Sequence, residues 1–187
     1  MDLLYLSAPA SVTMGFTFSM SVIPLAFIGN YLGVSQLNGA SIGYFITCII
    51  VLYPMMGMTF AMDTLCSHEY GRDRLSGEMG LILQRGVLIN FLILTPLCIA
   101  IYYLTPFLTL LYGASVAEIA QDFLTYAPLY FAPFMLFIAL TKFCNNQMQA
   151  HLPTIALTAG VILTPFLQLK FTPMGVRYTM IAMAISA

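Results

Sequence analysis

Charged side chains are few in this chain, and more than half of them stand in one short segment. Residues 62–85, MDTLCSHEYGRDRLSGEMGLILQR, hold seven of them, whereas the whole chain has six Lys and Arg and seven Asp and Glu. Acids within a membrane can take part in proton or cation movement, or pair with bases to hold helices together. The chemistry to expect from this segment is therefore ion exchange or ion pairing.

Asp63 is the acid that we place inside an apolar segment, roughly 10 Å of helix rise before the charged loop at about 1.5 Å per residue. A charged side chain in the membrane costs about 2.5–3.5 kcal/mol on insertion scales, so such a residue usually has a functional or structural role. One interpretation is a proton- or cation-linked group near a cytoplasmic gate. The other is a structural acid that is hydrogen-bonded to Thr64, or paired with Arg85 or Lys142 to hold helices together.

Further candidates for transport or gating lie near this acid and at a distant helix end. His68 could form a pH-sensitive gate, because histidine changes charge near neutral pH, or it could be a solvated loop residue. Gln84 and Arg85 begin the next apolar segment. Asn145 and Gln147 belong to an amide-rich stretch. Amide side chains can join helices by hydrogen bonds or line a water-filled path.

Two aromatic residues are candidates for a substrate cavity. Tyr44 and Phe16 could offer ring faces to organic cations, although packing against lipid or other helices is the default interpretation. We expect no enzyme and no catalytic residue, because the H-E-x-x-H pattern does not occur. We also expect no metal site and no cofactor, because no C-x-x-C pair occurs. The four cysteines are Cys48, Cys66, Cys98 and Cys144.

The composition determines what kind of element must position these residues. The chain is 60% hydrophobic and 7% charged, with a mean hydropathy of +0.93. A soluble domain carries about 25% charged residues, so this composition cannot build a water-facing surface. We therefore expect an integral membrane protein in contact with the lipid bilayer. The net charge of −1 and the lack of a basic stripe indicate no nucleic-acid partner.

The charge-free stretches predict an all-α, multi-pass helix bundle. A membrane helix needs about 20 apolar residues, and the apolar runs do not alternate as those of a β-barrel would. The stretch from 3 to 62 is long enough for two spans joined by the Gly- and Asn-rich turn at 29–40. The predicted spans are 3–28, 41–65, 81–103, 117–143, 152–169 and an incomplete 174–187.

Two further properties follow from these spans. Placing the N-terminus in the cytoplasm puts Arg72, Arg74, Arg85 and Lys142 inside and leaves Lys170 and Arg177 outside. Cytoplasmic loops carry excess Lys and Arg, so this orientation is favoured. Six prolines fall within spans, where they serve either as hinges or as the ordinary prolines of membrane helices. They are Pro24, Pro54, Pro96, Pro128, Pro133 and Pro165.

The charge-rich segment resembles a signature of the multidrug and toxic compound extrusion (MATE) transporters, in their eukaryotic branch. That signature runs roughly A-L-D-T-L-C-G-Q-A-Y-G-A, followed by L-Q-R at the start of the third helix. The residues that match are Ala61, Asp63, Thr64, Leu65, Cys66, Tyr70, Gly71, Leu83, Gln84 and Arg85. Those that depart from it are Ser67, His68, Glu69 and Arg72. FIGNYLG at 27–33 and KFCNNQ at 142–147 also resemble family segments, in the same order.

The resemblance implies a twelve-helix transporter built from two six-helix lobes. This chain, residues 1–187, would be the N-terminal lobe, cut within helix 6, and would contact a missing C-terminal lobe. Such proteins are secondary active antiporters that export organic cations, drugs or metabolites by alternating access. The coupling cation would be a proton rather than sodium, because span 1 lacks the acid that bacterial members often use. The resemblance places the main coupling acid in the missing half, and the protein in a plasma or a vacuolar or vesicular membrane.

Two alternatives remain open from the sequence. A related lipid-linked flippase or polysaccharide exporter would need basic residues inside its cavity for an anionic head group, and the first three spans hold no such residue at depth. A dimerising half-transporter would assemble from two copies of this short chain.

Overall fold

The computed structural model describes the backbone of residues 2–74 and 76–186, and the side chains of 11–74, 76–104 and 106–186. Within those residues every regular element is a helix. The elements are α1 (Asp2–Leu32), α2 (Val34–Thr47), η1 (Cys48–Leu52), α3 (Tyr53–Arg72), α4 (Glu78–Tyr102), α5 (Thr105–Tyr112), α6 (Ala114–Asn146), α7 (His151–Phe171), η2 (Thr172–Met174) and α8 (Val176–Ser186).

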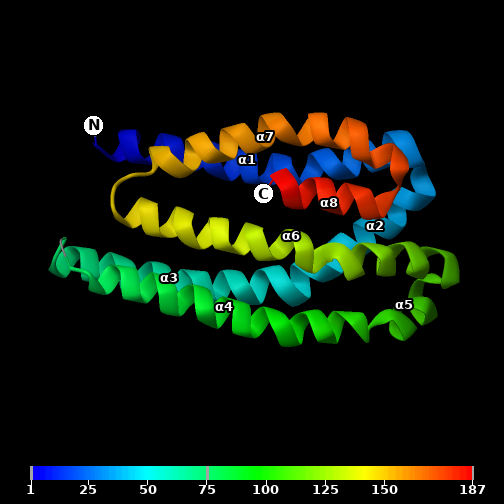
Figure 1. Cartoon of the computed structure of the whole chain (residues 1–187), viewed down its shortest axis with the longest axis horizontal. Coiled ribbons are helices and arrows are strands. Elements are labelled where there is room, and N and C mark those ends of the chain that lie inside the picture. Colours follow the sequence, from blue (N-terminus) through cyan, green and yellow to red (C-terminus); the bar gives the residue numbers. More distant parts are fainter. Residues whose placement is uncertain (1, 75, 187) are drawn as a thin grey trace.

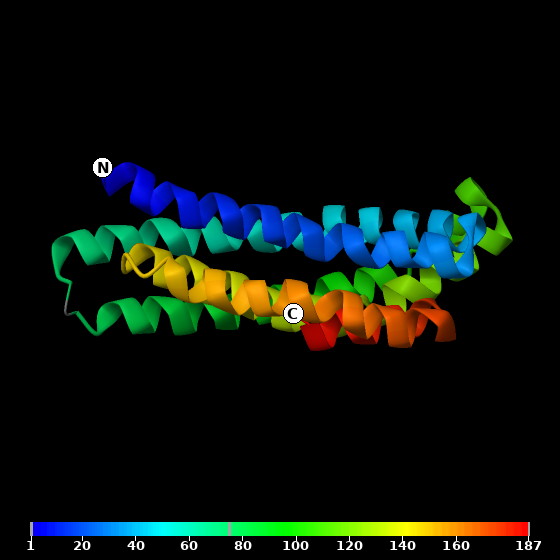
Figure 2. The ribbon, with the colours of Figure 1, turned by 90° about the horizontal axis from the view of Figure 1, so that it is seen from above.

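The helices run back and forth along one common axis (Figure 1). The view from above places α1 over α7 and α3 over α4, and both pairs are in contact (Figure 2). α6 is the central helix, since it packs against α2, α3, α4, α5 and α8. Its buried face carries Phe123, Phe131 and Phe134 together with Tyr130, so aromatic packing holds the middle of the bundle.

Five of these helical stretches are long and apolar enough to cross a membrane by length and composition. They are Ser11–Leu32, Val34–Arg72, Glu78–Tyr102, Ala114–Asn146 and His151–Met174, and α8 is a shorter apolar helix. Many large apolar side chains, such as Phe18, Leu92 and Leu110, are exposed on the surface of the bundle. An apolar surface of this kind suits contact with lipid. The chain is a multi-pass helical membrane protein, as its composition predicts.

The chain turns within the predicted stretch 29–40, but the turn is reduced to Gly33, because the other residues of this stretch are helical. Gly33 has a φ of 89°, which only glycine adopts cheaply, and it alone separates α1 from α2. Gly39 instead lets α2 approach α6. A Cβ on Gly39 would lie 2.6 Å from the Ile119 side chain, and one on Gly43 would lie 3.0 Å from the Ala120 carbonyl oxygen. The glycines serve helix packing here, as small residues commonly do in membranes.

The second predicted span is longer than expected. α2, η1 and α3 form one helical stretch of 39 residues, Val34–Arg72. At η1 the Tyr53 N–H donates to the Cys48 carbonyl, five residues back, which makes a π-helical turn. Pro54 follows directly and has no N–H to donate, so the local widening accommodates the proline.

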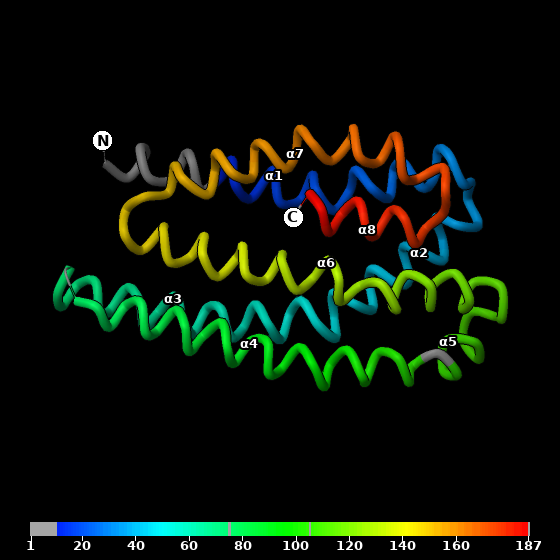
Figure 3. Tube along the Cα trace, viewed as in Figure 1, coloured from blue at the N-terminus to red at the C-terminus, as the bar shows by residue number. Residues whose placement is uncertain are grey.

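Two connections also differ from expectation. The charged segment is mostly helical, because α3 continues to Arg72 and α4 begins at Glu78. The short helix α5 was not predicted. It lies across the end of the bundle, between Leu104 and Gly113, as the chain trace shows (Figure 3). Its eight residues are too few to span a membrane, and for that reason the 3.6-residue pattern does not reveal them in the sequence.

Candidate functional site

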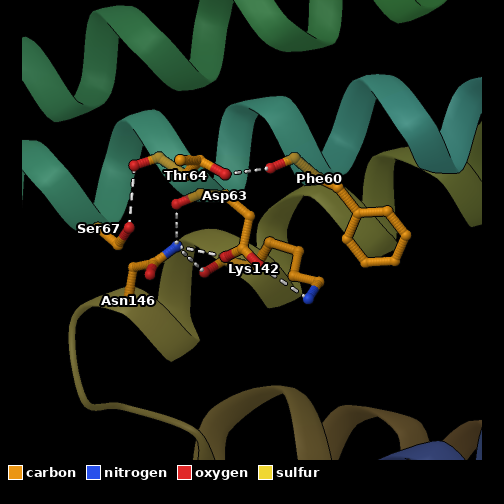
Figure 4. Close-up of polar contacts among 6 residues, drawn as sticks. All are labelled: Phe60, Asp63, Thr64, Ser67, Lys142 and Asn146. Atoms are coloured by element: carbon orange, nitrogen blue, oxygen red, sulfur yellow. Dashed lines mark hydrogen bonds and ion pairs between the residues drawn. The ribbon is translucent and has the colours of Figure 1, made fainter.

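Asp63 on α3 faces two side chains of α6 at the charge-rich end of the bundle (Figure 4). The Lys142 ammonium donates to Asp63 Oδ2 at 2.9 Å. The Asn146 amide donates to Asp63 Oδ1 at 2.7 Å. Lys142 and Asn146 stand four residues apart, so both lie on the same face of α6 and reach the same carboxylate. Both carboxylate oxygens are thus engaged from a single neighbouring helix.

Further contacts fix these side chains in place. The Asn146 amide also lies 3.3 Å from the Asp63 carbonyl oxygen and 3.0 Å from that of Lys142. The Lys142 ammonium lies 5.1 Å from the centre of the Phe60 ring, within the range of a cation–π contact. The two charged side chains are 22% and 30% exposed, so the ion pair is partly shielded from solvent. We call Phe60, Asp63, Lys142 and Asn146 the Asp63 cluster.

Of the partners predicted for Asp63, the structure shows Lys142. Thr64 instead donates its hydroxyl to the Phe60 carbonyl at 3.0 Å, within its own helix. Arg85 is exposed on α4. Phe60 was not predicted, and Asn146 was expected only as one of the amides at the end of its span that could join helices or line a cavity. The four-residue spacing of Lys142 and Asn146 on one helix was the signal that could have linked them to one acid.

His68 lies in the last turns of α3, not in a loop as one interpretation expected, and its side chain is exposed. Beside it, Glu69 is buried and accepts a hydrogen bond of 2.8 Å from Arg72 in the same helix. Arg74 lies over the Tyr70 ring at 5.4 Å. These contacts join residues of α3 or of the short connection after it, so they organise the end of one helix.

The remaining predicted candidates do not join this cluster. Gln84 is exposed on α4, while Asn145 and Gln147 are half-buried at the end of α6. Tyr44 is half-buried on α2 and packs edge-on against Phe123 of α6, with ring centres 6.3 Å apart. Phe16 is half-buried on α1. The structure therefore brings Asp63 to α6 but leaves the other candidates apart.

A second ion pair joins helices at the opposite end of the bundle. Arg177 of α8 makes two hydrogen bonds to the Asp122 carboxylate of α6, at 2.8 and 3.1 Å. Sequence reasoning missed it, because the residues are 55 positions apart and no local pattern links them. Each end of α6 thus carries one ion pair to another helix. Within the described residues, no three His, Cys, Asp or Glu side chains come together in a way that could hold a metal ion.

The family of this chain follows from its similarity to known proteins. A family model described as MatE matches residues 9–169, which is most of the chain. The chain belongs to the MatE family. Relatives of this MatE chain are named for extrusion rather than for an enzymatic reaction, so the expectation of no enzyme is confirmed.

Relatives of the chain include plant and vertebrate proteins, in agreement with the eukaryotic branch. Protein DETOXIFICATION 17 of Arabidopsis thaliana is 28% identical over 149 residues, which cover 79% of this chain and 30% of that protein. Multidrug and toxin extrusion protein 1 of Xenopus tropicalis is 34% identical, over 78% of this chain and 25% of that protein. The human protein of the same name is 30% identical, with the same coverage. The chain thus spans roughly a quarter to a third of these relatives. No solved structure matches it.

Proposed function

We propose that this chain is the N-terminal lobe of a secondary active antiporter. The full protein exports organic cations, drugs or metabolites in exchange for protons, with sodium as the second candidate ion, by alternating access. The observation that carries the proposal is the family match over residues 9–169, in a chain whose five apolar helices can span a membrane. The vertebrate relatives are named for multidrug and toxin extrusion, which supports a small organic substrate.

Transport in sealed vesicles tests this function. Vesicles containing the full-length protein would be loaded with a fluorescent organic cation such as ethidium, and its movement followed under an imposed pH gradient. We expect movement that stops when a protonophore collapses the gradient. Movement that follows a sodium gradient alone would replace the proton with sodium. Movement that ignores both gradients would contradict the proposed antiport.

We propose that the Asp63 cluster is a joint that holds α3 and α6 together as the lobe moves. Two observations support a structural role. Both carboxylate oxygens already have donors, and both donors come from one helix. A group that exchanges protons during transport would have to release Lys142 in each cycle. Coupling would then depend mainly on acids of the second lobe. Gradient-driven transport by a full-length protein that lacks those acids would contradict this.

We further propose that the charge-rich end of the bundle faces the cytoplasm. The start of α1, the connection at 73–77 and the connection at 147–150 all lie at this end (Figure 1). The basic residues near it are Arg72, Arg74, Arg85 and Lys142, whereas Lys170 and Arg177 lie toward the other end. The excess of basic residues supports a cytoplasmic N-terminus.

A further inference from the structure

A groove opens between α4 and α6 at the end of the bundle near α5. Its volume is about 350 Å³, within the range of about 300–1,000 Å³ that is typical of small-molecule sites. Its lining residues come from the last turns of α4, the residue after it and the first half of α6. These two helices lie side by side near α5 (Figure 1). The lining residues are Cys98, Ile99, Ile101, Tyr102, Tyr103, Gln121, Leu124, Thr125 and Pro128.

A small cavity lies beside the groove, deeper in the bundle. This second cavity, of about 10 Å³, shares Cys98, Ile101, Leu124 and Pro128 with the groove. The second cavity reaches Thr47 and Val51 beside the π-helical turn. Its further lining is apolar, from Leu94, Ala127 and Phe131. The Thr47 hydroxyl already donates to the Gly43 carbonyl. A ligand in the groove would therefore meet unengaged polar groups near the mouth and mostly apolar walls below.

Polar groups gather on the α6 wall of the groove. Gln121 and Thr125 stand one turn apart on α6, and both line it. Pro128 has no N–H, so the carbonyl of Leu124, four residues earlier, loses its usual helical donor. Leu124 lines the groove as well. The Thr125 hydroxyl already donates to the Gln121 backbone carbonyl at 2.8 Å. A ligand hydroxyl placed here could therefore donate to Thr125 Oγ1 or to the Leu124 carbonyl, and accept from the Gln121 side-chain amide.

The absence of charge in the groove lining indicates which kind of amphiphilic ligand can bind there. None of the nine lining residues carries a formal charge. A phosphate head group would find no Lys or Arg there, although phosphates are usually bound by such residues. The nearby Arg177 is already engaged by Asp122. Tyr102 and Tyr103, with ring centres 5.9 Å apart, stand at the mouth, as tyrosines do at membrane interfaces.

We propose that this groove binds a sterol, with its hydroxyl at Gln121 and Thr125 and its ring body against Cys98, Leu124 and Pro128. An uncharged molecule with one hydroxyl and a rigid apolar body matches both the polar mouth and the apolar depth. A rigid ligand also loses little conformational freedom on binding. The site is separate from the Asp63 cluster, which lies at the other end of α6. It does not depend on the transport cycle proposed above.

Photolabelling with a diazirine analogue of cholesterol tests the site. The purified protein would be placed in phosphatidylcholine vesicles with the probe, irradiated, and the labelled residues mapped by mass spectrometry. We expect label within residues 98–103 or 121–128, and competition by unlabelled cholesterol. Label spread evenly over the lipid-facing helices would overturn the proposal. Competition by added diacylglycerol as strong as that by cholesterol would show a site for acyl chains, and would overturn it too.

Variants of the polar pair sharpen the test. Gln121→Leu combined with Thr125→Val keeps the shape of the groove but removes its side-chain hydrogen bonds. Labelling should fall about five- to tenfold, as expected for the loss of one or two hydrogen bonds. Thr95→Val is the matched control, because Thr95 is an exposed α4 threonine outside the groove whose hydroxyl bonds to the Phe91 carbonyl. Gel filtration would first show that both variants are folded. Equal labelling of the double variant and the control would then overturn the sterol assignment.

Discussion

At the scale of single residues, the Asp63–Lys142 ion pair should contribute more to the stability of the protein than the more exposed Glu69–Arg72 pair on α3. Lys142→Met leaves a partly buried carboxylate without its cation, whereas Arg72→Met breaks a pair whose arginine is 64% exposed. We expect Lys142→Met to cost about 1–3 kcal/mol of stability, and Arg72→Met to cost clearly less because solvent screens its pair. Thermal unfolding in detergent measures both.

The charge-exchanged pair distinguishes ion pairing from packing. Asp63→Lys with Lys142→Asp should recover part of the stability that either single change removes, because it restores opposite charges between α3 and α6. An additive loss in the double variant would show that the contribution of Lys142 comes from packing on Phe60 instead.

Asn90 on α4 should bind a water molecule. It is 3% exposed, and its Oδ1 has no partner within the described part of the chain, while its amide lies 3.5 Å from Thr59 Oγ1. It lines a cavity of about 10 Å³ between α3, α4 and α6, which is close to the volume that one water needs. A high-resolution structure should show that water on Oδ1.

Substitutions at Asn90 test the same account by stability. Asn90→Leu should be neutral or stabilising within about 1 kcal/mol, since Thr59 already donates to the Met55 carbonyl. Asn90→Asp should destabilise the protein, because it buries a charge beside apolar residues. A strongly destabilised Leu variant would mean that the amide has a further role.

At the scale of elements, the close packing of α2 on α6 depends on glycine. Gly39→Ala places a Cβ 2.6 Å from the Ile119 side chain, so one helix must shift, at a cost of about 1–3 kcal/mol. Gly57→Ala on α3 is the control, because a Cβ there meets nothing within 4 Å. The control should be neutral or slightly stabilising, since alanine restricts the unfolded chain. Equal unfolding temperatures for the two variants would contradict this role of Gly39.

The sequence predicts the elements much better than their junctions. Long charge-free stretches locate the helices, because lipid requires about 20 apolar residues for each span. Glycines that indicate turns in water also indicate close packing in a membrane, which explains why the turn predicted across 29–40 is reduced to Gly33. Gly33 and Gly39 cannot be told apart by residue type, since the difference lies in the partner helix. The Asp122–Arg177 pair joins distant parts of the chain and could not be found locally either.

At the scale of the whole molecule, the orientation in the membrane follows from the ends of the bundle. Ser76 lies in the short connection at the charge-rich end, and Met174 lies at the opposite end with 62% of its surface exposed. Cysteines placed at these positions in a cysteine-free variant would report the two sides separately. We expect an impermeant maleimide to label Met174→Cys in intact cells if the protein resides in the plasma membrane, and Ser76→Cys only after permeabilisation.

The reverse labelling pattern would contradict the cytoplasmic N-terminus, and labelling of both positions from one side would contradict the antiparallel arrangement itself. For a vacuolar or vesicular protein, sealed organelles replace the cells, and Ser76→Cys should then react first because its end still faces the cytoplasm. The physical reason is the same in either membrane. Lys and Arg near short loops are retained on the cytoplasmic side, and four of the six basic residues belong to the end that carries Ser76. Orientation therefore depends on the charge-rich end, whichever ion the full protein uses.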